Sequence, residues 1–335
     1  MSAKPPILIL HATGTNRDRE AAWACELAGG AAKIIHVNQL FAGERRLADY
    51  RMLVLPGGFS YGDDLGAGKL WAVALRHRLG DDLTAFIAAG RPVLGICNWF
   101  QVLVKAGVLQ ESGGRRQEAG DRRQETGSRR QETGDRRQEA GDRRQETGDR
   151  KQETGDRRQE TGASEMSCSL TPDPCALITD PCALIPDPHP LTPAFTLTRN
   201  DSARFECRLV YLEANQASPC VFTRGLTAPI YCPVAHGEGK FVARDAETLA
   251  ALEAGGGAAL RYTGPAGAPA AYPWNPNGSQ NDIAGICNPQ GNVLGLMPHP
   301  EDHLIPEHHP RYHHGERGMT GSPLFRNGVK YAAEL

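Results

Sequence analysis

A block of tandem repeats divides this chain of 335 residues and limits what the rest can fold into. From residue 115 to residue 163, a seven-residue unit of the form Arg-Arg-Gln-Glu-Thr-Gly-Asp recurs seven times with few changes. The unit offers no apolar residue for the seam of a coiled coil, and its glycine destabilises a helix by about 1 kcal/mol relative to alanine. Because this segment has nothing to bury, we expect it to be solvated and disordered.

A second repeat follows directly. The hexapeptide Asp-Pro-Cys-Ala-Leu-Ile occurs at residues 173–178 and 180–185 and leads into a proline-rich run that ends at Pro190. Prolines at this density block both helices and central strands. We therefore interpret residues 111–190 as one insertion of 80 residues. It separates the two parts, 1–110 and 191–335, of a single compact domain of 255 residues.

Charge and cysteine usage exclude several classes of protein. The chain has 37 basic and 39 acidic residues, and the repeat block itself is nearly balanced, so no attraction to nucleic acid or anionic lipid is expected. We find no apolar stretch long enough to span a membrane and no signal-peptide pattern. The nine cysteines form no Cys-x-x-Cys pair, and their odd number argues against a complete disulfide framework. These features predict a cytoplasmic protein with reduced thiols.

Outside the insertion, short apolar runs alternate with helical patterns. The first half predicts strands at residues 7–10, 33–37, 52–55 and 93–96 and helices at residues 17–28, 81–89 and 100–106. The second half is richer in strands, at residues 204–212, 229–234, 241–244, 258–262, 283–287 and 293–297. This order predicts an α/β fold with an open, mostly parallel sheet flanked by helices. Ligands of such sheets bind at the carboxyl ends of the strands.

Two loops at such strand ends carry residues suited to nucleophilic catalysis. Cys97 follows the strand at 93–96 and precedes a helix, whose N-terminus favours the thiolate, although a small buried cysteine is the structural alternative. His299 and Glu301 follow the strand at 293–297, and a carboxylate two residues away can orient the imidazole. The structural alternative for this second loop is a turn with incidental polar residues.

A glycine-rich loop follows a third strand. Gly57 and Gly58 permit the close backbone approach that an oxyanion hole requires. A phosphate-binding loop is the competing interpretation, but the Lys-Ser/Thr ending of a nucleotide P-loop is absent.

Together these segments resemble the class I, or triad-type, glutamine amidotransferases. The resemblance rests on Pro-Gly-Gly-Phe-Ser-Tyr-Gly-Asp-Asp-Leu-Gly-Ala-Gly at 56–68, Gly-Ile-Cys-Asn at 95–98 with Phe-Gln at 100–101, and Met-Pro-His-Pro-Glu at 297–301. Segments 200–208, 233–239 and 275–279 extend it over essentially all residues outside the insertion. Within this family the chain is most similar to the glutaminase subunits of phosphoribosylformylglycinamidine synthase, the fourth step of purine biosynthesis.

The resemblance implies a flavodoxin-like fold and the hydrolysis of L-glutamine to glutamate and ammonia. In this family the cysteine, here Cys97, is the nucleophile, the histidine, His299, moves the proton, and the glutamate, Glu301, orients the histidine. The residues expected to hold the oxyanion or the glutamine are Gly58, Phe59, Asn98, Gln101, Arg204 and Phe205. His236 and Glu238 are expected to be structural or to face a partner protein.

The same resemblance implies partners. Ammonia would pass to an ATP-dependent synthetase subunit that converts formylglycinamide ribonucleotide to formylglycinamidine ribonucleotide, and a small accessory subunit is expected in the same complex. ATP and magnesium would belong to the synthetase, so no cofactor and no metal are expected in this chain. The C-terminal histidines do not change this expectation, because Pro306 and Pro310 disfavour a helix through them.

One residue departs from the family pattern. Trp99 stands where the family has glycine after Cys-Asn, so its side chain must either point outward or force the turn open. An open turn would misplace the oxyanion donors. A non-catalytic docking subunit of the same complex is therefore one alternative function, and a cysteine hydrolase with the same fold is another.

The insertion generates a first prediction. Deleting residues 111–190 should leave the melting temperature and the glutaminase rate nearly unchanged, because the free energy of closing a loop grows only logarithmically with its length. Thermal unfolding and glutamate release by the deleted and full-length chains test this. A collapse of either quantity would refute it.

Overall fold

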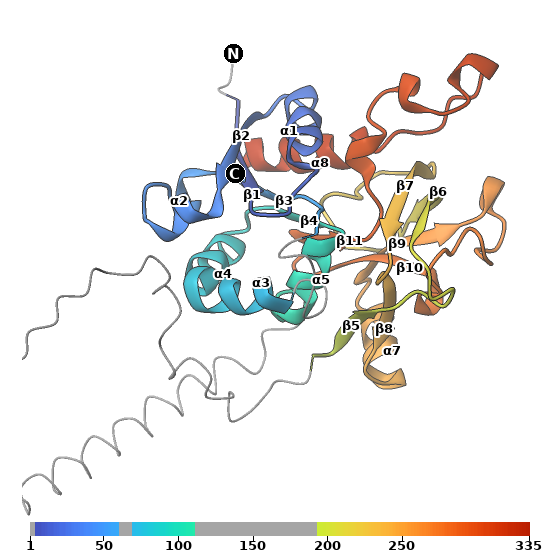
Figure 1. Ribbon diagram of the computed structural model, residues 1–335, viewed down its shortest axis with the longest axis horizontal. Helices are drawn as coiled ribbons and strands as arrows, with labels where there is room; N and C mark the ends of the chain where they lie inside the picture. The colour runs from blue at the N-terminus through green and yellow to red at the C-terminus, as the bar shows by residue number, and fades with distance from the viewer. Residues whose placement is uncertain (1–3, 60–68, 111–192) are drawn as a thin grey trace, which may run out of the picture. The chain divides into compact units, whose positions relative to one another are not determined.

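The computed structural model describes residues 4–59, 69–110 and 193–335, which are arranged around one open sheet (Figure 1). The predicted insertion at 111–190 lies outside the described residues. Within them, nine strands form the sheet in the order β2-β1-β3-β4-β11-β10-β9-β6-β7. The strands are β1 Pro6–His11, β2 Ala31–His36, β3 Met52–Leu55, β4 Val93–Ile96, β6 Glu206–Ala214, β7 Ile230–His236, β9 Ala258–Thr263, β10 Ile283–Cys287 and β11 Val293–Leu296. A two-stranded sheet pairs β5 Phe195–Thr198 with β8 Lys240–Ala243.

Strands β2, β1, β3, β4 and β11 are parallel and form the half of the sheet that carries the predicted loops. Strands β3, β4 and β11 are buried at every position, as expected for parallel strands covered on both faces. Helices α1 and α8 cover one face of this half, and α3, α4 and α5 cover the other (Figure 1). The sequence-based prediction of an open α/β sheet is confirmed.

The three predicted helices are present as α1, α4 and α5, and α2, α3, α7 and α8 were not predicted. The helices are α1 Asp18–Leu27, α2 Val37–Phe41, α3 Lys69–Ala74, α4 Gly80–Ala88, α5 Asn98–Lys105, α7 Ala246–Ala254 and α8 Ser322–Glu334, with a π-helical segment at Leu75–Leu79. Single 3-10 turns occur at Leu47–Asp49, Pro265–Gly267, Gln280–Asp282, Pro300–Asp302, Pro306–His308 and Tyr312–His314. Helix α5 begins two residues earlier than predicted, directly after Cys97, so the cysteine stands at its N-cap.

The other half of the sheet is antiparallel. Strands β10, β9, β6 and β7 follow β11 in that order, and each pairs antiparallel with its neighbours. This matches the strand-rich pattern of the second half of the sequence. Its longest strands, β6 and β7, alternate between buried and more exposed positions, which is typical of a sheet with one covered face.

Two glycines let helix α5 pack directly against the sheet. A Cβ atom on Gly295 of β11 would lie 2.2 Å from Cδ2 of Phe100, and one on Gly95 of β4 would lie 2.5 Å from Cδ1 of Leu103. The Phe100 ring is fully buried, so it has no space into which it can move. Close packing of α5 therefore depends on the absence of a side chain at these positions.

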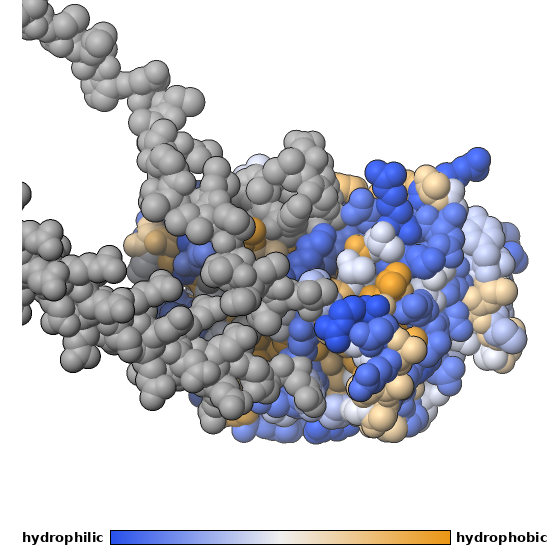
Figure 2. All heavy atoms as spheres, turned by 90° about the horizontal axis from the view of Figure 1, so that it is seen from below, coloured by the Kyte–Doolittle hydropathy of each residue, from blue (hydrophilic) through white to orange (hydrophobic). Residues whose placement is uncertain are grey.

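In Figure 2, hydrophilic residues cover most of the coloured face, and the hydrophobic patches between them are small and separate. None of the helices that the structure describes is long and apolar enough to cross a membrane.

The contact between α5 and the sheet generates a second prediction. Gly295→Ala should lower the free energy of unfolding by about 1–3 kcal/mol, because the added methyl group overlaps the buried Phe100 ring. Urea denaturation measures the change. Gly80→Ala is the matched control, since its backbone is helical and the added Cβ would meet only the Leu75 carbonyl oxygen, at 3.7 Å. Equal stability of the two variants would contradict the prediction.

Candidate active site

Cys97 lies on a sharp turn between β4 and α5. Its backbone has φ 54° and ψ −110°, a conformation that residues with a side chain rarely adopt. The Cys97 amide donates to the carbonyl oxygen of Leu296 (2.8 Å), while the Cys97 carbonyl oxygen accepts from the amides of Phe100 (3.0 Å) and Gln101 (3.3 Å). The strained turn is thus fixed to β11 on one side and to the first turn of α5 on the other.

His299 and Glu301 follow β11, the strand next to β4. The His299 amide donates to the carbonyl oxygen of Pro233 in β7 (2.8 Å), which fixes the loop. Nδ1 of His299 lies 2.8 Å from Oε1 of Glu301, and the two side chains are only 5% and 0% exposed. A buried carboxylate therefore orients the imidazole and leaves its Nε2 for Cys97.

Three loops meet at this point. Strands β4 and β11 pair in parallel with Ile96 opposite Leu296, so the loops that follow them start side by side. A Cβ atom on Gly57, after β3, would lie 2.6 Å from Cε1 of His299 and 3.3 Å from the Cys97 Cβ. Gly57 thus packs against the cysteine and the histidine together, and no other residue would leave room for this arrangement.

Opposing effects set the pKa of His299. Burial lowers the pKa, but the charges of Glu301 and Cys97 and the hydrogen bond to Glu301 raise it, and the net result lies well above the ordinary value. A raised histidine pKa beside a cysteine favours transfer of the thiol proton to the imidazole. The arrangement can hold a thiolate and an imidazolium ion together.

A cavity of about 230 Å³ opens above Cys97. Five of the residues predicted to hold the oxyanion or glutamine line it: Gly58, Phe59, Asn98, Gln101 and Phe205. The rings of Phe59 and Phe205 are 6.3 Å apart, and both side chains are about half exposed. Arg204 is not among the lining residues; its carbonyl oxygen accepts from Asn200 Nδ2 (2.9 Å).

The backbone near the glycine-rich loop has two features that bear on the oxyanion. The Phe59 amide donates to the carbonyl oxygen of Gly14 (2.9 Å), so it is already engaged. Gly58 packs against the same residue, and a Cβ atom on it would lie 2.3 Å from the Gly14 carbonyl oxygen. The segment after β1 therefore supports this loop, a role that sequence reasoning did not assign to it.

Asn98 and Gln101 are joined on the other side of the cavity. Nδ2 of Asn98 donates to Oε1 of Gln101 (3.2 Å), and Nε2 of Gln101 donates to the carbonyl oxygen of Glu238 (2.6 Å). Helix α5 is thereby linked to the segment after β7. The Gln101 amide is held in one orientation before any ligand enters.

The segment after β7 lies closer to the chemistry than expected. His236, Gly237 and Glu238 line the cavity together with Cys97, and His236 is only 3% exposed. His236 was expected to be structural or to face a partner protein, and its burial in the cavity wall leaves the structural alternative. His236 follows a predicted strand closely, as Cys97 and His299 do. This position could have identified it as a residue of the site.

Trp99 neither points outward nor opens the turn. Its side chain is fully buried, and the hydrogen bonds on both sides of Cys97 are in place. The two outcomes considered from the sequence are thus both wrong, since α5 turns the indole into the core. Cys97 remains a lining residue of the cavity.

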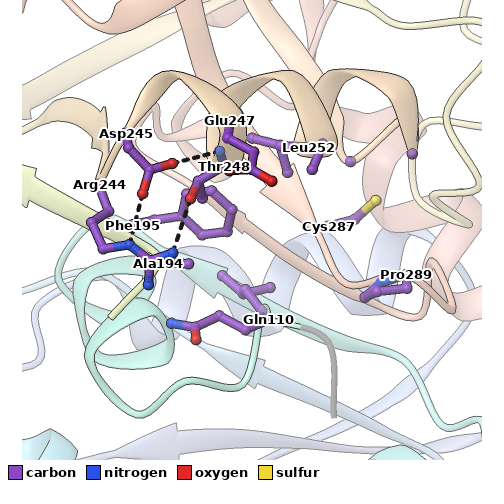
Figure 3. Close-up of a pocket in the computed structure, with 14 residues that line it drawn as sticks. Gln110, Ala194, Phe195, Arg244, Asp245, Glu247, Thr248, Leu252, Cys287 and Pro289 are labelled. Atoms are coloured by element: carbon purple, nitrogen blue, oxygen red, sulfur yellow. Dashed lines mark hydrogen bonds and ion pairs between the residues drawn. The ribbon is translucent and has the colours of Figure 1, made fainter. Parts of the chain in front are cut away.

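A larger cavity, of about 420 Å³, lies between helix α7 and the end of β10 (Figure 3). The polar groups at its edge are paired with one another: Asp245 accepts from the Thr248 amide (2.7 Å) and from Nε of Arg244 (2.9 Å). The Cys287 thiol also lines it. No histidine is among its lining residues, so it lacks the nucleophile and base pair found at Cys97.

The described residues offer no cluster of three or more His, Cys, Asp or Glu side chains that could hold a metal ion. His303 and His309, from the histidine-rich C-terminal segment, instead pack with the ring of Tyr231. Nδ1 of His303 also hydrogen-bonds to the Tyr231 carbonyl oxygen.

Comparison with known proteins agrees with the geometry. The family model of the CobB/CobQ-like glutamine amidotransferase domain matches residues 4–132 and 175–332. Phosphoribosylformylglycinamidine synthase subunit PurQ of Treponema denticola is 38% identical over 98% of this chain and 99% of the relative. Its counterpart in Dehalococcoides mccartyi is 34% identical over 99% of this chain and 100% of the relative.

A solved structure shows the same fold. The structure of PurLQS from Thermotoga maritima matches with a TM-score of 0.57 and 24% identity, covering 98% of this chain and 99% of that chain. The resemblance drawn from the sequence is confirmed by these relatives. The chain belongs to the glutamine amidotransferase family and, within it, to the PurQ subunits of phosphoribosylformylglycinamidine synthase.

Proposed function

We propose that this chain hydrolyses L-glutamine to glutamate and ammonia and delivers the ammonia to a synthetase subunit. The observation that carries the proposal is the buried His299–Glu301 pair beside Cys97, where the loops after β4 and β11 meet. The relatives are named as subunits of phosphoribosylformylglycinamidine synthase. The product of the whole complex would thus be formylglycinamidine ribonucleotide.

The first half of the reaction uses the thiolate of Cys97. It attacks the side-chain amide carbon of glutamine, and backbone amides near Gly58 and Asn98 stabilise the negative oxygen that forms. When the intermediate collapses, the carbon–nitrogen bond breaks and the His299 imidazolium gives its proton to the leaving nitrogen. Ammonia departs, and a thioester joins Cys97 to the glutamyl group.

The second half releases glutamate. Neutral His299 takes a proton from water, the hydroxide attacks the thioester carbon, and the carbon–sulfur bond breaks. Glu301 stabilises the positive charge on His299 at each stage and holds the ring in one tautomer. Gln101 and Phe205 would position the substrate from the cavity walls, whereas Arg204 is outside the lining residues.

Partners follow from the same proposal. ATP and magnesium would be bound by the synthetase subunit, and the solved structure named PurLQS supports an assembly with that subunit. We propose a small accessory subunit in the same assembly. We propose that this assembly is cytoplasmic. The function of a docking subunit without activity is not favoured, because buried Trp99 leaves the turn at Cys97 hydrogen-bonded on both sides.

Removing the nucleophile separates glutamine use from the rest of the complex. Cys97→Ala should abolish glutamine-dependent synthesis of formylglycinamidine ribonucleotide by the reconstituted complex and leave ammonia-dependent synthesis unchanged. Cys25→Ala, a buried cysteine in α1, is the matched control and should retain both activities. Glutamine-dependent synthesis by Cys97→Ala would overturn the proposal.

Removing the Glu301 carboxylate, which orients His299, should lower activity by lowering the pKa of His299. Glu301→Gln removes a charge that raises the pKa of His299, while the burial that lowers it remains, so the pKa should fall. The imidazolium ion is then less populated at neutral pH, and kcat for glutamine should drop by a factor of about 10³–10⁴. Histidine NMR titration and steady-state kinetics measure the two effects. An unchanged His299 pKa in the folded variant would contradict the assignment.

A further inference from the structure

A second buried histidine, which the proposed mechanism does not use, lies in the wall of the Cys97 cavity. His236 is the last residue of β7, and its ring is almost completely buried. Burial and the nearby charge of His299 lower the pKa of His236 to about 3. The ring is therefore neutral at any pH at which the protein works, and it carries a single proton on one of its two nitrogens.

Asn277 determines which nitrogen carries that proton. Nδ2 of Asn277 lies 3.1 Å from Nε2 of His236, and an amide nitrogen can only donate. Nδ2 has two hydrogens and three neighbours, because it also faces Tyr262 Oη (3.1 Å) and the Gly239 carbonyl oxygen (2.9 Å). A proton on Nε2 would point at the Asn277 amino group, which cannot accept, so the arrangement favours the proton on Nδ1. The Asn277 amide cannot turn over without loss, because its Oδ1 accepts from the amide (3.1 Å) and Oγ (2.8 Å) of Ser279 while Nδ2 also faces the Gly239 carbonyl oxygen (2.9 Å).

The ring itself is equally restricted. A Cβ atom on Gly239 would lie 2.1 Å from Cδ2 and 2.2 Å from Nε2 of His236, so this edge of the imidazole is closed off. Nδ1 lies on the opposite edge of the ring. It is buried, and no hydrogen-bond partner for it exists among the described residues. A buried N–H group without an acceptor is destabilising, so this donor calls for a ligand.

We propose that His236 is the neutral hydrogen-bond donor of the glutamine pocket, giving its Nδ1–H to an oxygen atom of bound glutamine, and that Asn277 is the positioning residue that fixes this tautomer. The inference rests on the proposed function, because the cavity that His236 lines is the one above Cys97. Two neighbouring histidines thus have opposite roles. His299 changes its charge during the reaction, whereas His236 keeps its proton throughout.

One segment has no role in the proposed mechanism but gains one from its contact with His236. Asn-Pro-Asn-Gly-Ser, at residues 275–279, precedes β10 and has no side chain among the residues lining the cavity. Asn275 holds the turn together by accepting from the amides of Gly278 (2.9 Å) and Ser279 (3.2 Å). This turn places the Asn277 side chain against His236. The segment thus acts on the substrate through the histidine.

The tautomer is tested first, without reference to activity. Histidine-selective ¹⁵N NMR of the full-length chain should show His236 as the Nδ1–H tautomer, unchanged between pH 5 and pH 8. Asn277→Asp replaces the donor with an acceptor and should convert His236 to the Nε2–H tautomer or to the charged form. Asn288→Asp places the same change at another buried asparagine, in the β10–β11 turn, and should leave His236 unaffected. An Nε2–H tautomer in the unmodified chain would overturn the proposal.

Binding of glutamine is tested second, by calorimetry on the full-length chain carrying Cys97→Ala, so that no turnover occurs. In His236→Asn, the side-chain amide nitrogen takes about the place of Nδ1 and keeps the donor, so Kd should change by less than about threefold. In His236→Gln, the amide moves to about the place of Nε2, where it meets Asn277, and Kd should rise about tenfold. Similar Kd values for these two variants would overturn the donor role.

The two measurements distinguish this inference from the proposed function. A Cys97→Ala chain that binds no glutamine would overturn both, whereas normal binding with the wrong tautomer would overturn only the inference. Melting temperatures of all variants show whether they are folded. Asn277→Ala, which removes the contact without adding a charge, serves as the second variant if Asn277→Asp does not fold; it should free the His236 tautomer and weaken binding.

Discussion

The pairing of β4 with β11 is the constraint on which the rest of this structure depends. These strands lie about two hundred residues apart in the chain, yet their parallel register places Ile96 opposite Leu296. Cys97 and His299 therefore start from adjacent strand ends. Each nearby contact reinforces this arrangement: the Cys97 amide donates to the Leu296 carbonyl oxygen of β11, and Gly57, in the loop after β3, packs against both side chains. The chemistry of the site follows from the sheet rather than from any single loop.

Two buried histidines near this pair of strands have pKa values that are shifted in opposite directions. His299 pairs with a buried carboxylate, which outweighs the effect of burial and raises its pKa. His236 has no such carboxylate, and its pKa falls to about 3. The charge of Glu301 raises the pKa of His299, whereas burial and the charge of His299 lower the pKa of His236, whose Nε2 faces the neutral Asn277 amide. One side chain is thereby suited to moving protons and the other to donating a fixed hydrogen bond.

Much of this arrangement could be predicted from the sequence, because local patterns carry it. The apolar runs that became β3, β4 and β11 are buried at every position, and the loops after them contain the residues singled out. What could not be predicted depends on packing between distant segments. The direction in which Trp99 points is set by the core beneath α5, and the Phe59 amide is engaged by Gly14, a residue from another loop. The burial of His236 could not be predicted for the same reason, since it depends on contacts with Asn277 and Gly239.

The separation of the two strands also has a consequence for synthesis of the protein. The nucleophile is made in the first third of the chain, whereas the residues that activate it are added close to the last strand of the sheet. Because β11 has to insert between β4 and β10 before the imidazole reaches the sulfur, a nascent chain still lacking that strand carries an unactivated thiol. A chain that ends before β11 also lacks His299 and Glu301, so it cannot assemble the pair that activates Cys97.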